Sequence, residues 1–276
     1  MASRMTSSGR RTPPGRSLVW LFLIGILVFL YAPLVPPVLL ALQDPATGTL
    51  NVTSFGAIAG DQVLMGALLN SVIRAIIVGI AAPLLGLAAA QAVRAFGIPR
   101  LIITVILLPL FIPGASMGVS TSLFFKLTAI PPSLFTMAVV QILWALPFAF
   151  LIILTVMSGF DTIYLEAAYT SGSNRLQAFW DIELPQIAPG ISGAAIFSII
   201  LSFNETVRTA IVQGGNNTVQ TFVWSRYQQV GLTPNMYALM SLIIAVTLLL
   251  ILALVVLGRR GQNKTQGRAV TTASEG

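Results

Sequence analysis

Two charged side chains that could do chemistry stand inside an otherwise apolar stretch. They are Glu205 and, three residues later, Arg208, with Asn204 directly before them. A charge at the centre of a bilayer costs at least roughly 2.5–3.5 kcal/mol, so such residues need a partner or a water-filled path. At a spacing of three they are close neighbours on one helical face. The residues indicate a structural ion pair or the lining of a transport pathway, and Asn70 is a polar candidate for the same pathway or for a hydrogen bond between helices.

The residue types that are missing exclude several kinds of catalytic site. Histidine and cysteine are both absent, which removes disulfides, the commonest zinc ligands and imidazole acid–base chemistry. The phosphate-binding pattern G-x-x-x-x-G-K-[ST] does not occur either. We therefore predict no catalytic residue, metal site or cofactor in this chain. An alternative role for Glu205 is that of a proton carrier, in which case the chain would be an ion-coupled secondary transporter.

A second pattern occupies the long connection at residues 158–186. Asp161 can cap a short helix that begins at Ile163, and Gly172 permits a turn that a residue with a Cβ resists. A second short helix is expected at residues 175–182, and Pro185 is expected to stop it and redirect the chain. Two small helices with apolar residues such as Trp180 are typical of a docking site for another protein.

The fixed positions of this connection are Glu166, Ala167, Ala168, Gly172, Ile182, Leu184 and Pro185. Their order and spacing resemble the EAA loop of ABC importer permeases. The stretch that begins at Asn70-Ser71 looks like the start of the transmembrane core of type I importers. Within that class, the chain most resembles the second permease of the spermidine/putrescine type. It departs from that type at Asn204, which replaces the first residue of an acidic pair, and at Arg208.

The resemblance implies a type I ABC importer permease fold in which the loop forms cytoplasmic coupling helices. Ala167 and Ala168 would allow close approach to the ATP-hydrolysing subunit, Gly172 would set the bend, and Glu166 would orient the loop. The implied partners are two ATP-binding subunits holding ATP and Mg²⁺, a homologous permease in a heterodimer, and a periplasmic or lipid-anchored substrate-binding protein. The implied substrate is a small polar solute, a polyamine or related organic cation, with an organic anion, an opine or an amino-acid derivative left open by Arg208.

The elements that position these residues are apolar helices. The chain has 276 residues, 56% hydrophobic and 8% charged, whereas a soluble domain carries roughly 25% charged residues. A spanning helix needs about 20 apolar residues, so we predict an all-α membrane protein with six spans at 18–42, 63–93, 101–125, 134–157, 187–212 and 237–257. Pro109 and Pro113 should kink the third span. The first is expected to be a retained anchor, not a cleaved signal peptide.

The distribution of Lys and Arg predicts the orientation, because these residues accumulate on the cytoplasmic side. One side holds Arg4, Arg10, Arg11, Arg16, Arg94, Arg100, Arg175, Arg259, Arg260, Lys264 and Arg268, against Lys126 and Arg226 on the other. Both termini are therefore expected in the cytoplasm, as tails at 1–17 and 259–276 around a permease domain at 18–258, whose core starts near residue 63. The resemblance implies the inner membrane of a bacterium. Arg74 is expected to extend to the outer interface. A nucleic-acid partner is not expected, because no basic stripe alternates with aromatics.

Overall fold

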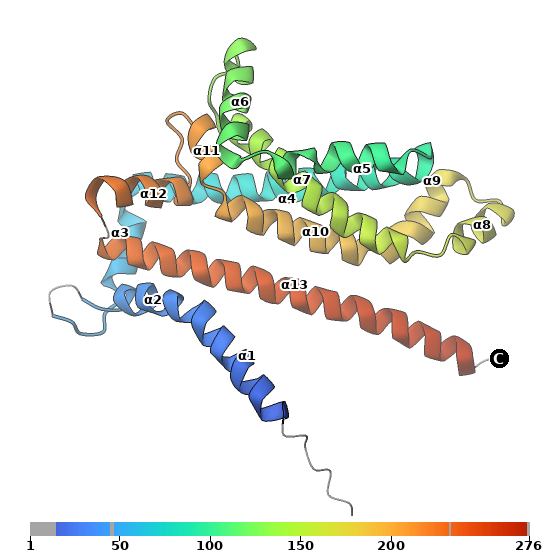
Figure 1. Ribbon diagram of the computed structural model, residues 1–276, viewed down its shortest axis with the longest axis horizontal. Helices are drawn as coiled ribbons and strands as arrows, with labels where there is room; N and C mark the ends of the chain where they lie inside the picture. Colours follow the sequence, from blue (N-terminus) through green and yellow to red (C-terminus); the bar gives the residue numbers. More distant parts are fainter. Residues whose placement is uncertain (1–14, 45–46, 232, 275–276) are drawn as a thin grey trace, which may run out of the picture.

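The computed structural model describes residues 15–44, 47–231 and 233–274, which are mostly helical (Figure 1). Five helices in this part of the chain are long and apolar enough to cross a membrane: Leu18–Ala41, Gln62–Phe96, Leu134–Ser158, Arg175–Asn204 and Pro234–Val256. A bent pair, Pro99–Phe111 and Gly114–Leu127, makes a sixth span when it is counted as one. The expected all-α membrane architecture is confirmed. Arg4, Arg10 and Arg11, which contributed to the predicted orientation, lie outside the described residues.

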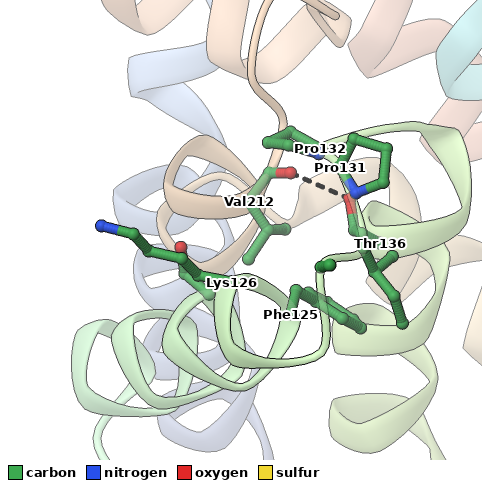
Figure 2. A pocket seen from close by; sticks show the side chains of 9 residues that line it. Phe125, Lys126, Pro131, Pro132, Thr136 and Val212 are labelled. Carbon is green, nitrogen blue, oxygen red and sulfur yellow. Dashed lines mark hydrogen bonds between the residues drawn. The ribbon is translucent and has the colours of Figure 1, made fainter.

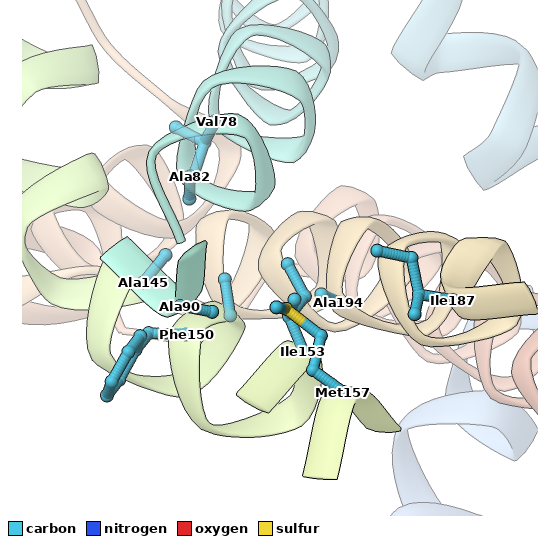
Figure 3. Packing of buried hydrophobic residues seen from close by; sticks show 10 residues of the cluster. Val78, Ala82, Ala90, Ala145, Phe150, Ile153, Met157, Ile187 and Ala194 are labelled. Atoms are coloured by element: carbon cyan, nitrogen blue, oxygen red, sulfur yellow. The ribbon is translucent and has the colours of Figure 1, made fainter. Parts of the chain in front are cut away.

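The core consists of three helices, α4 (Gln62–Phe96), α7 (Leu134–Ser158) and α10 (Leu184–Asn204). Their shared interior is a cluster of buried residues that includes Ala82, Ala149, Ile153 and Ala194 (Figure 3). Small residues matter here because lipid tails are as apolar as the side chains, so helices associate through close packing. At Gly86, for example, an added Cβ would lie only 2.9 Å from a backbone nitrogen of α7.

The third predicted span is sharply bent. It comprises α5 (Pro99–Leu107), the 3₁₀ turn η2 (Leu108–Phe111) and α6 (Gly114–Leu127), and the two parts meet at 102°. Ile112 has an extended backbone with ψ 124°, as expected of a residue before proline, and Pro113 cannot continue the hydrogen-bond ladder. The predicted kink is confirmed, and it directs α6 away from the core to pack against α11 (Val207–Val212).

The fifth predicted span, 187–212, is wrong as a continuous helix. Helix α10 ends at Asn204, and Glu205 has an extended backbone with φ −84° and ψ 121°. The chain then starts the separate short helix α11. At its other end α10 continues directly from α9 (Arg175–Ala178) and the π-helical turn η3 (Phe179–Glu183). The span therefore begins earlier and ends earlier than the hydropathy of the sequence indicates.

The remaining helices surround the core. They are α1 (Gly15–Tyr31), the 3₁₀ turn η1 (Ala32–Leu34), α2 (Val35–Ala41), α3 (Thr53–Gly60), α12 (Val219–Val230) and α13 (Pro234–Ser274). Side chains 18–36 are all exposed, and α1 stands apart from the core in Figure 1. Helix α13 packs on α2, α3 and α10, and it continues beyond residue 258 through most of the predicted tail. Helices α8 and α9 lie at one end of the molecule and α3 and α12 at the other (Figure 1).

Candidate functional site

The connection after α7 folds as a small two-helix projection, here called the knob and defined as residues 161–183. Its first helix, α8 (Ile163–Thr170), begins where Asp161 Oδ1 accepts the backbone N–H of Ile163 at 3.0 Å. Gly172 then adopts φ +89°, a conformation that side chains with a Cβ rarely take. The first helix, its cap and the glycine turn are all where the sequence indicates.

The predicted coupling residues divide into an inner and an outer set. Ala168 is buried in a small apolar cluster with Leu165 and Ala178, and Ile182 packs against it. Glu166 and Ala167 are exposed on the outer face of α8. Four large apolar side chains of the knob are also more than half exposed: Ile163 at 64%, Tyr164 at 55%, Leu176 at 67% and Trp180 at 57%. An apolar surface of this kind on a polar connection is typical of a protein interface.

The prediction that Pro185 stops the second knob helix is wrong. Residues 175–204 form one uninterrupted helical run, in which η3 is wider than an α-helix and the N–H of Leu184 donates to the carbonyl of Phe179. Pro185 then falls at the start of α10, where a missing N–H is tolerated. The knob is thus attached to α10 without a loop, and half-buried Leu184 packs on the core cluster.

Glu205 and Arg208 form a buried ion pair across the break between α10 and α11. Glu205 Oε2 lies 2.7 Å from Nη1 of Arg208, and Glu205 Oε1 accepts the backbone N–H of Arg208 at 2.8 Å. The two residues are 6% and 9% exposed. The carboxylate therefore caps α11 as well as pairing with its cation. Removal of either side chain would leave the other as an uncompensated buried charge, so the pair holds the break in place.

An aromatic ring and a helix of small residues cover the ion pair. The guanidinium carbon of Arg208 lies 3.9 Å from the ring centroid of Trp144, a distance suited to a cation–π interaction. On α6, a Cβ at Gly114 would come within 3.1 Å of the same carbon atom, and Gly118 lies against the Arg208 backbone. Trp144 and these glycines were not predicted as part of the site. The pair fastens α7, α11 and the bent helix α6 together.

Three further polar residues form a buried hydrogen-bond chain beside the pair. Gln141 Nε2 donates to Thr209 Oγ1 at 2.7 Å, and Ser202 Oγ donates to Gln141 Oε1 at 2.6 Å. The chain links α7 to both sides of the break. No local pattern marks these residues, because each is a single polar position in an apolar helix.

Arg74 does not extend to the outer interface as expected, because it is only 1% exposed. Its Nε donates to the carbonyl of Asn70 at 3.4 Å, and its Nη1 lies 4.0 Å from Met137 Sδ of α7. This face of α4 packs on α7, so the side chain enters the interface between the two helices. No carboxylate of the described residues forms an ion pair with it, although Glu205 interacts with it electrostatically.

The two asparagines predicted to line a pathway lie in different surroundings. Asn204, the last residue of α10, is exposed and donates only to Ile200 O of its own helix, at 2.9 Å. Asn70 is half-buried and its Nδ2 donates to the carbonyl of Asn217 at 3.0 Å. Beside it, Ser71 Oγ accepts the N–H of Val219 at 2.9 Å. Asn70 thus holds the connection that leads into α12.

A pocket of about 390 Å³ lies near these residues but is separate from them. It is lined by Lys126, Pro131, Pro132, Thr136 and Val212 among others, and Thr136 donates to the carbonyl of Val212 at 3.0 Å (Figure 2). Lys126 is its charged side chain. None of the four residues predicted to line a pathway contributes to it.

Sequence reasoning missed an ion pair at the knob end of the core. Glu183 of η3 is 3% exposed, and both of its carboxylate oxygens lie 2.7 Å from Arg94 Nη2. Gln91 Nε2 also donates to Glu183 Oε1 at 2.7 Å. Arg94 was considered only as a marker of orientation. The contact places the end of α4 beside the knob.

Comparison with known proteins agrees with this architecture. Residues 17–263 match the family described as binding-protein-dependent transport system inner membrane component. The chain is 25% identical over 155 residues to the spermidine/putrescine transport system permease protein PotC of Escherichia coli (strain K12), covering 56% of this chain and 58% of that protein. It is 27% identical over 241 residues to the putrescine transport system permease protein PotI of the same strain, covering 81% and 84%.

A solved structure shows the same fold at low sequence identity. A bacterial ABC transporter involved in the import of the acidic polysaccharide alginate contains a chain that is 18% identical, with a TM-score of 0.63 and coverage of 88% of this chain and 94% of that one. The fold is therefore that of an ABC importer permease. Because the family match spans most of its length, the chain belongs to the family of binding-protein-dependent transport system inner membrane components.

Proposed function

We propose that this chain forms half of the translocation pathway of an ATP-driven, binding-protein-dependent importer, and that its knob seats on an ATP-binding subunit. The observation that carries the proposal is the exposed apolar surface of the knob, including Ile163, Leu176 and Trp180, on a projection joined rigidly to the core helix α10. Membership of a transport family supports it. ATP and Mg²⁺ would act in the ATP-binding subunit, and this chain would contribute the movement of its helices.

The other partners follow from the same proposal. A homologous permease would complete the pathway, as membership of the transport family supports. Two ATP-binding subunits would bind the two permease knobs. A periplasmic or lipid-anchored binding protein would deliver the substrate; a structural relative of this chain has been solved with a periplasmic protein bound to an alginate pentasaccharide.

For the substrate we propose a small polar solute, a polyamine or related organic cation. The relatives named for spermidine and putrescine transport support this class. The charged residues near the break in α10 do not set the specificity in this proposal. Of the four residues predicted to line a pathway, Glu205 and Arg208 pair with each other inside the bundle and Asn70 binds the connection to α12. Asn204 is the exposed one of the four and would make the pathway contact. The binding protein would then provide most of the selection.

The proposed orientation has both termini in the cytoplasm. Arg94 and the knob lie together at one end of the molecule, as their ion pair requires. Arg226 belongs to α12, which Figure 1 places at the opposite end. This arrangement supports a cytoplasmic knob, with α3 and α12 on the outer side of the inner membrane.

A pull-down from membranes tests the docking proposal. The native chain and the variants Gly172→Asp and Gly231→Asp would be used as bait. Both glycines have positive φ, at +89° and +75°, with no atom within 4 Å of an added Cβ, so both substitutions strain the backbone without a steric clash, and only Gly172 lies in the knob. We expect an ATP-binding protein and a second permease with the native chain and with Gly231→Asp, and loss of the ATP-binding protein with Gly172→Asp.

Two results would contradict the proposal. One is a well-folded native chain that brings down no ATP-binding protein. The other is a Gly172→Asp variant with normal ATPase binding and normal uptake. The substrate is tested separately, by mass spectrometry of the ligand in the co-purified binding protein and by competition of uptake with putrescine and spermidine; a ligand that is neither a polyamine nor another organic cation would refute the proposed class.

A further inference from the structure

The carboxylate of Glu183 is held in an unusual position for a charged residue. It is 3% exposed, at the last position of the π-helical turn η3, where the knob becomes the core helix α10. Burial of a carboxylate is unfavourable unless hydrogen bonds and a counter-charge compensate for the lost water. Both are present: Arg94 Nη2 lies 2.7 Å from each oxygen and Gln91 Nε2 donates at 2.7 Å.

The donors come from a different helix, close to its end. Gln91 and Arg94 lie one turn apart on the last part of α4, and Arg94 Nη2 also donates to Gln91 Oε1 at 2.6 Å. The hydrogen bond between the two side chains therefore keeps both oriented toward the carboxylate of Glu183. The side chain of Arg94 is 35% exposed and that of Glu183 only 4%, so the carboxylate is covered while part of the Arg94 side chain stays accessible.

Besides the short chain connection from α7 at residues 159–160, the knob is attached to the core at two points. The first is the helix that runs from α9 through η3 into α10, and the second is the contact between Glu183 and α4. If the helix were the only attachment, a force on the knob would bend the helix at η3, because its wider turn interrupts the regular α-helical hydrogen bonds. The second attachment prevents that bending. Helix α4 packs along both α7 and α10, so a displacement passed to α4 reaches all three core helices.

We propose that Glu183 is a positioning residue that fastens the knob to α4, so that the knob and the three core helices move as one body when an ATP-binding subunit displaces the knob. The inference rests on the docking function proposed for the knob. It adds the residues that transmit the movement: Glu183, which is the unspecified position between Ile182 and Leu184 of the coupling pattern, and Arg94 and Gln91, which lie on another helix.

The first test separates transmission from docking. Uptake, ATP hydrolysis and pull-down of the ATP-binding subunit would be measured for the assembled transporter with Glu183→Gln. We expect normal pull-down and retained ATP hydrolysis, but uptake per ATP hydrolysed reduced about tenfold, within the roughly 5–150-fold range of couplings between sites. Gln186→Ala is the control, because Gln186 lies outside the knob on the next turn of the same helical run, is exposed and donates to the carbonyl of Ile182 at 3.1 Å; it should leave the uptake per ATP hydrolysed unchanged.

Exchange of the two charges provides a rescue that a packing role would not give. The variant Glu183→Arg alone should lower the uptake per ATP hydrolysed. Addition of Arg94→Glu should restore this ratio to at least half of its native value. A Glu183→Gln variant with a native ratio would overturn the proposal. Loss of the ATP-binding subunit from the Glu183→Gln pull-down would also overturn it, since the residue would then shape the docking surface. Failure of the native chain to bind that subunit would instead refute the proposed function.

A cross-link keeps the proposal testable if the charge variants fold poorly. The chain has no cysteine, so Gln91→Cys with Glu183→Cys gives a single reactive pair. Without reagent, uptake per ATP should be low, and a short bifunctional thiol reagent should restore it by joining α4 to the knob again. If the cross-link instead stops uptake, the knob and α4 must move relative to each other during transport, and the proposal is wrong.

Discussion

The close approach of α4 to α7 at Gly86 allows a quantitative test of the core. An added Cβ at Gly86 would lie 2.9 Å from Phe150 N, 3.1 Å from Ala149 C and 3.2 Å from Phe150 Cα. The first distance is about 0.5 Å shorter than the start of ordinary van der Waals contact at 3.4 Å. All three atoms are backbone atoms of α7, so no side-chain rotation relieves the overlap. The two helices must move apart.

The expected cost of Gly86→Ala follows from two opposing contributions. Overpacking of a well-packed interface costs roughly 1–3 kcal/mol, whereas alanine in place of glycine inside a helix gains up to about 1 kcal/mol. Gly66 of the same helix has nothing within 4 Å of an added Cβ. Gly66→Ala should therefore show only the gain in helix stability, without the cost of overpacking. The difference between the two variants should therefore be about 1–3 kcal/mol in the free energy of unfolding.

The measurement is reversible unfolding of the purified chain in detergent micelles, followed by far-ultraviolet circular dichroism, for the native chain and both variants. Gly66→Ala should unfold at the same or a higher denaturant level than the native chain, and Gly86→Ala at a lower level than Gly66→Ala. Equal stability of the two variants would refute the reasoning, because it would mean that α4 and α7 do not approach each other as closely as the structure has them.

Three other expectations concern polar residues and orientation. Glu205→Gln should destabilise the chain by about 3–5 kcal/mol, because it leaves the buried Arg208 without its counter-ion. Asn204→Ala should have little effect, since the Asn204 side chain is exposed and bonds only within its own helix. Unfolding curves that coincide for the two variants would contradict this expectation. Gln141→Leu should cost about 0.6–2 kcal/mol, the usual range for hydrogen bonds between membrane helices, and a more stable variant would show that the buried chain of hydrogen bonds is dispensable. A cysteine introduced into the C-terminal tail should react with an impermeant maleimide only after the cytoplasmic side is opened, and labelling of intact cells would refute the predicted orientation.

Several elements of the fold were predictable because their signals are local. Each long helix has a run of apolar residues that lipid requires, and the kink of the third span follows from Pro113 and the residue before it. The knob was predictable in its first half because Asp161 and Gly172 act on their immediate neighbours. These inferences need no knowledge of which helices touch.

The predictions that were wrong concern where a helix ends or where a long side chain points. Pro185 reads as a helix stop, but the π-helical turn before it lets the helix continue. Residues 187–212 read as one span, but the carboxylate of Glu205 caps a new helix after the break. The sequence predicted that Arg74 extends to the outer membrane interface, but the face of α4 that carries it packs on α7. In each case a contact or a local hydrogen bond outweighs the hydropathy of the stretch.

By itself the sequence determined that the chain is a helical membrane protein with a long loop that folds as short helices, because hydropathy and a spaced motif are properties of the linear chain. Only the tertiary structure decided which polar residues meet. Glu183 and Arg94 are 89 positions apart, and Gln141 and Thr209 are 68 apart. Their pairing depends on how each helix is rotated about its axis and how deeply it packs, and an apolar stretch of nearly uniform hydrophobicity specifies neither.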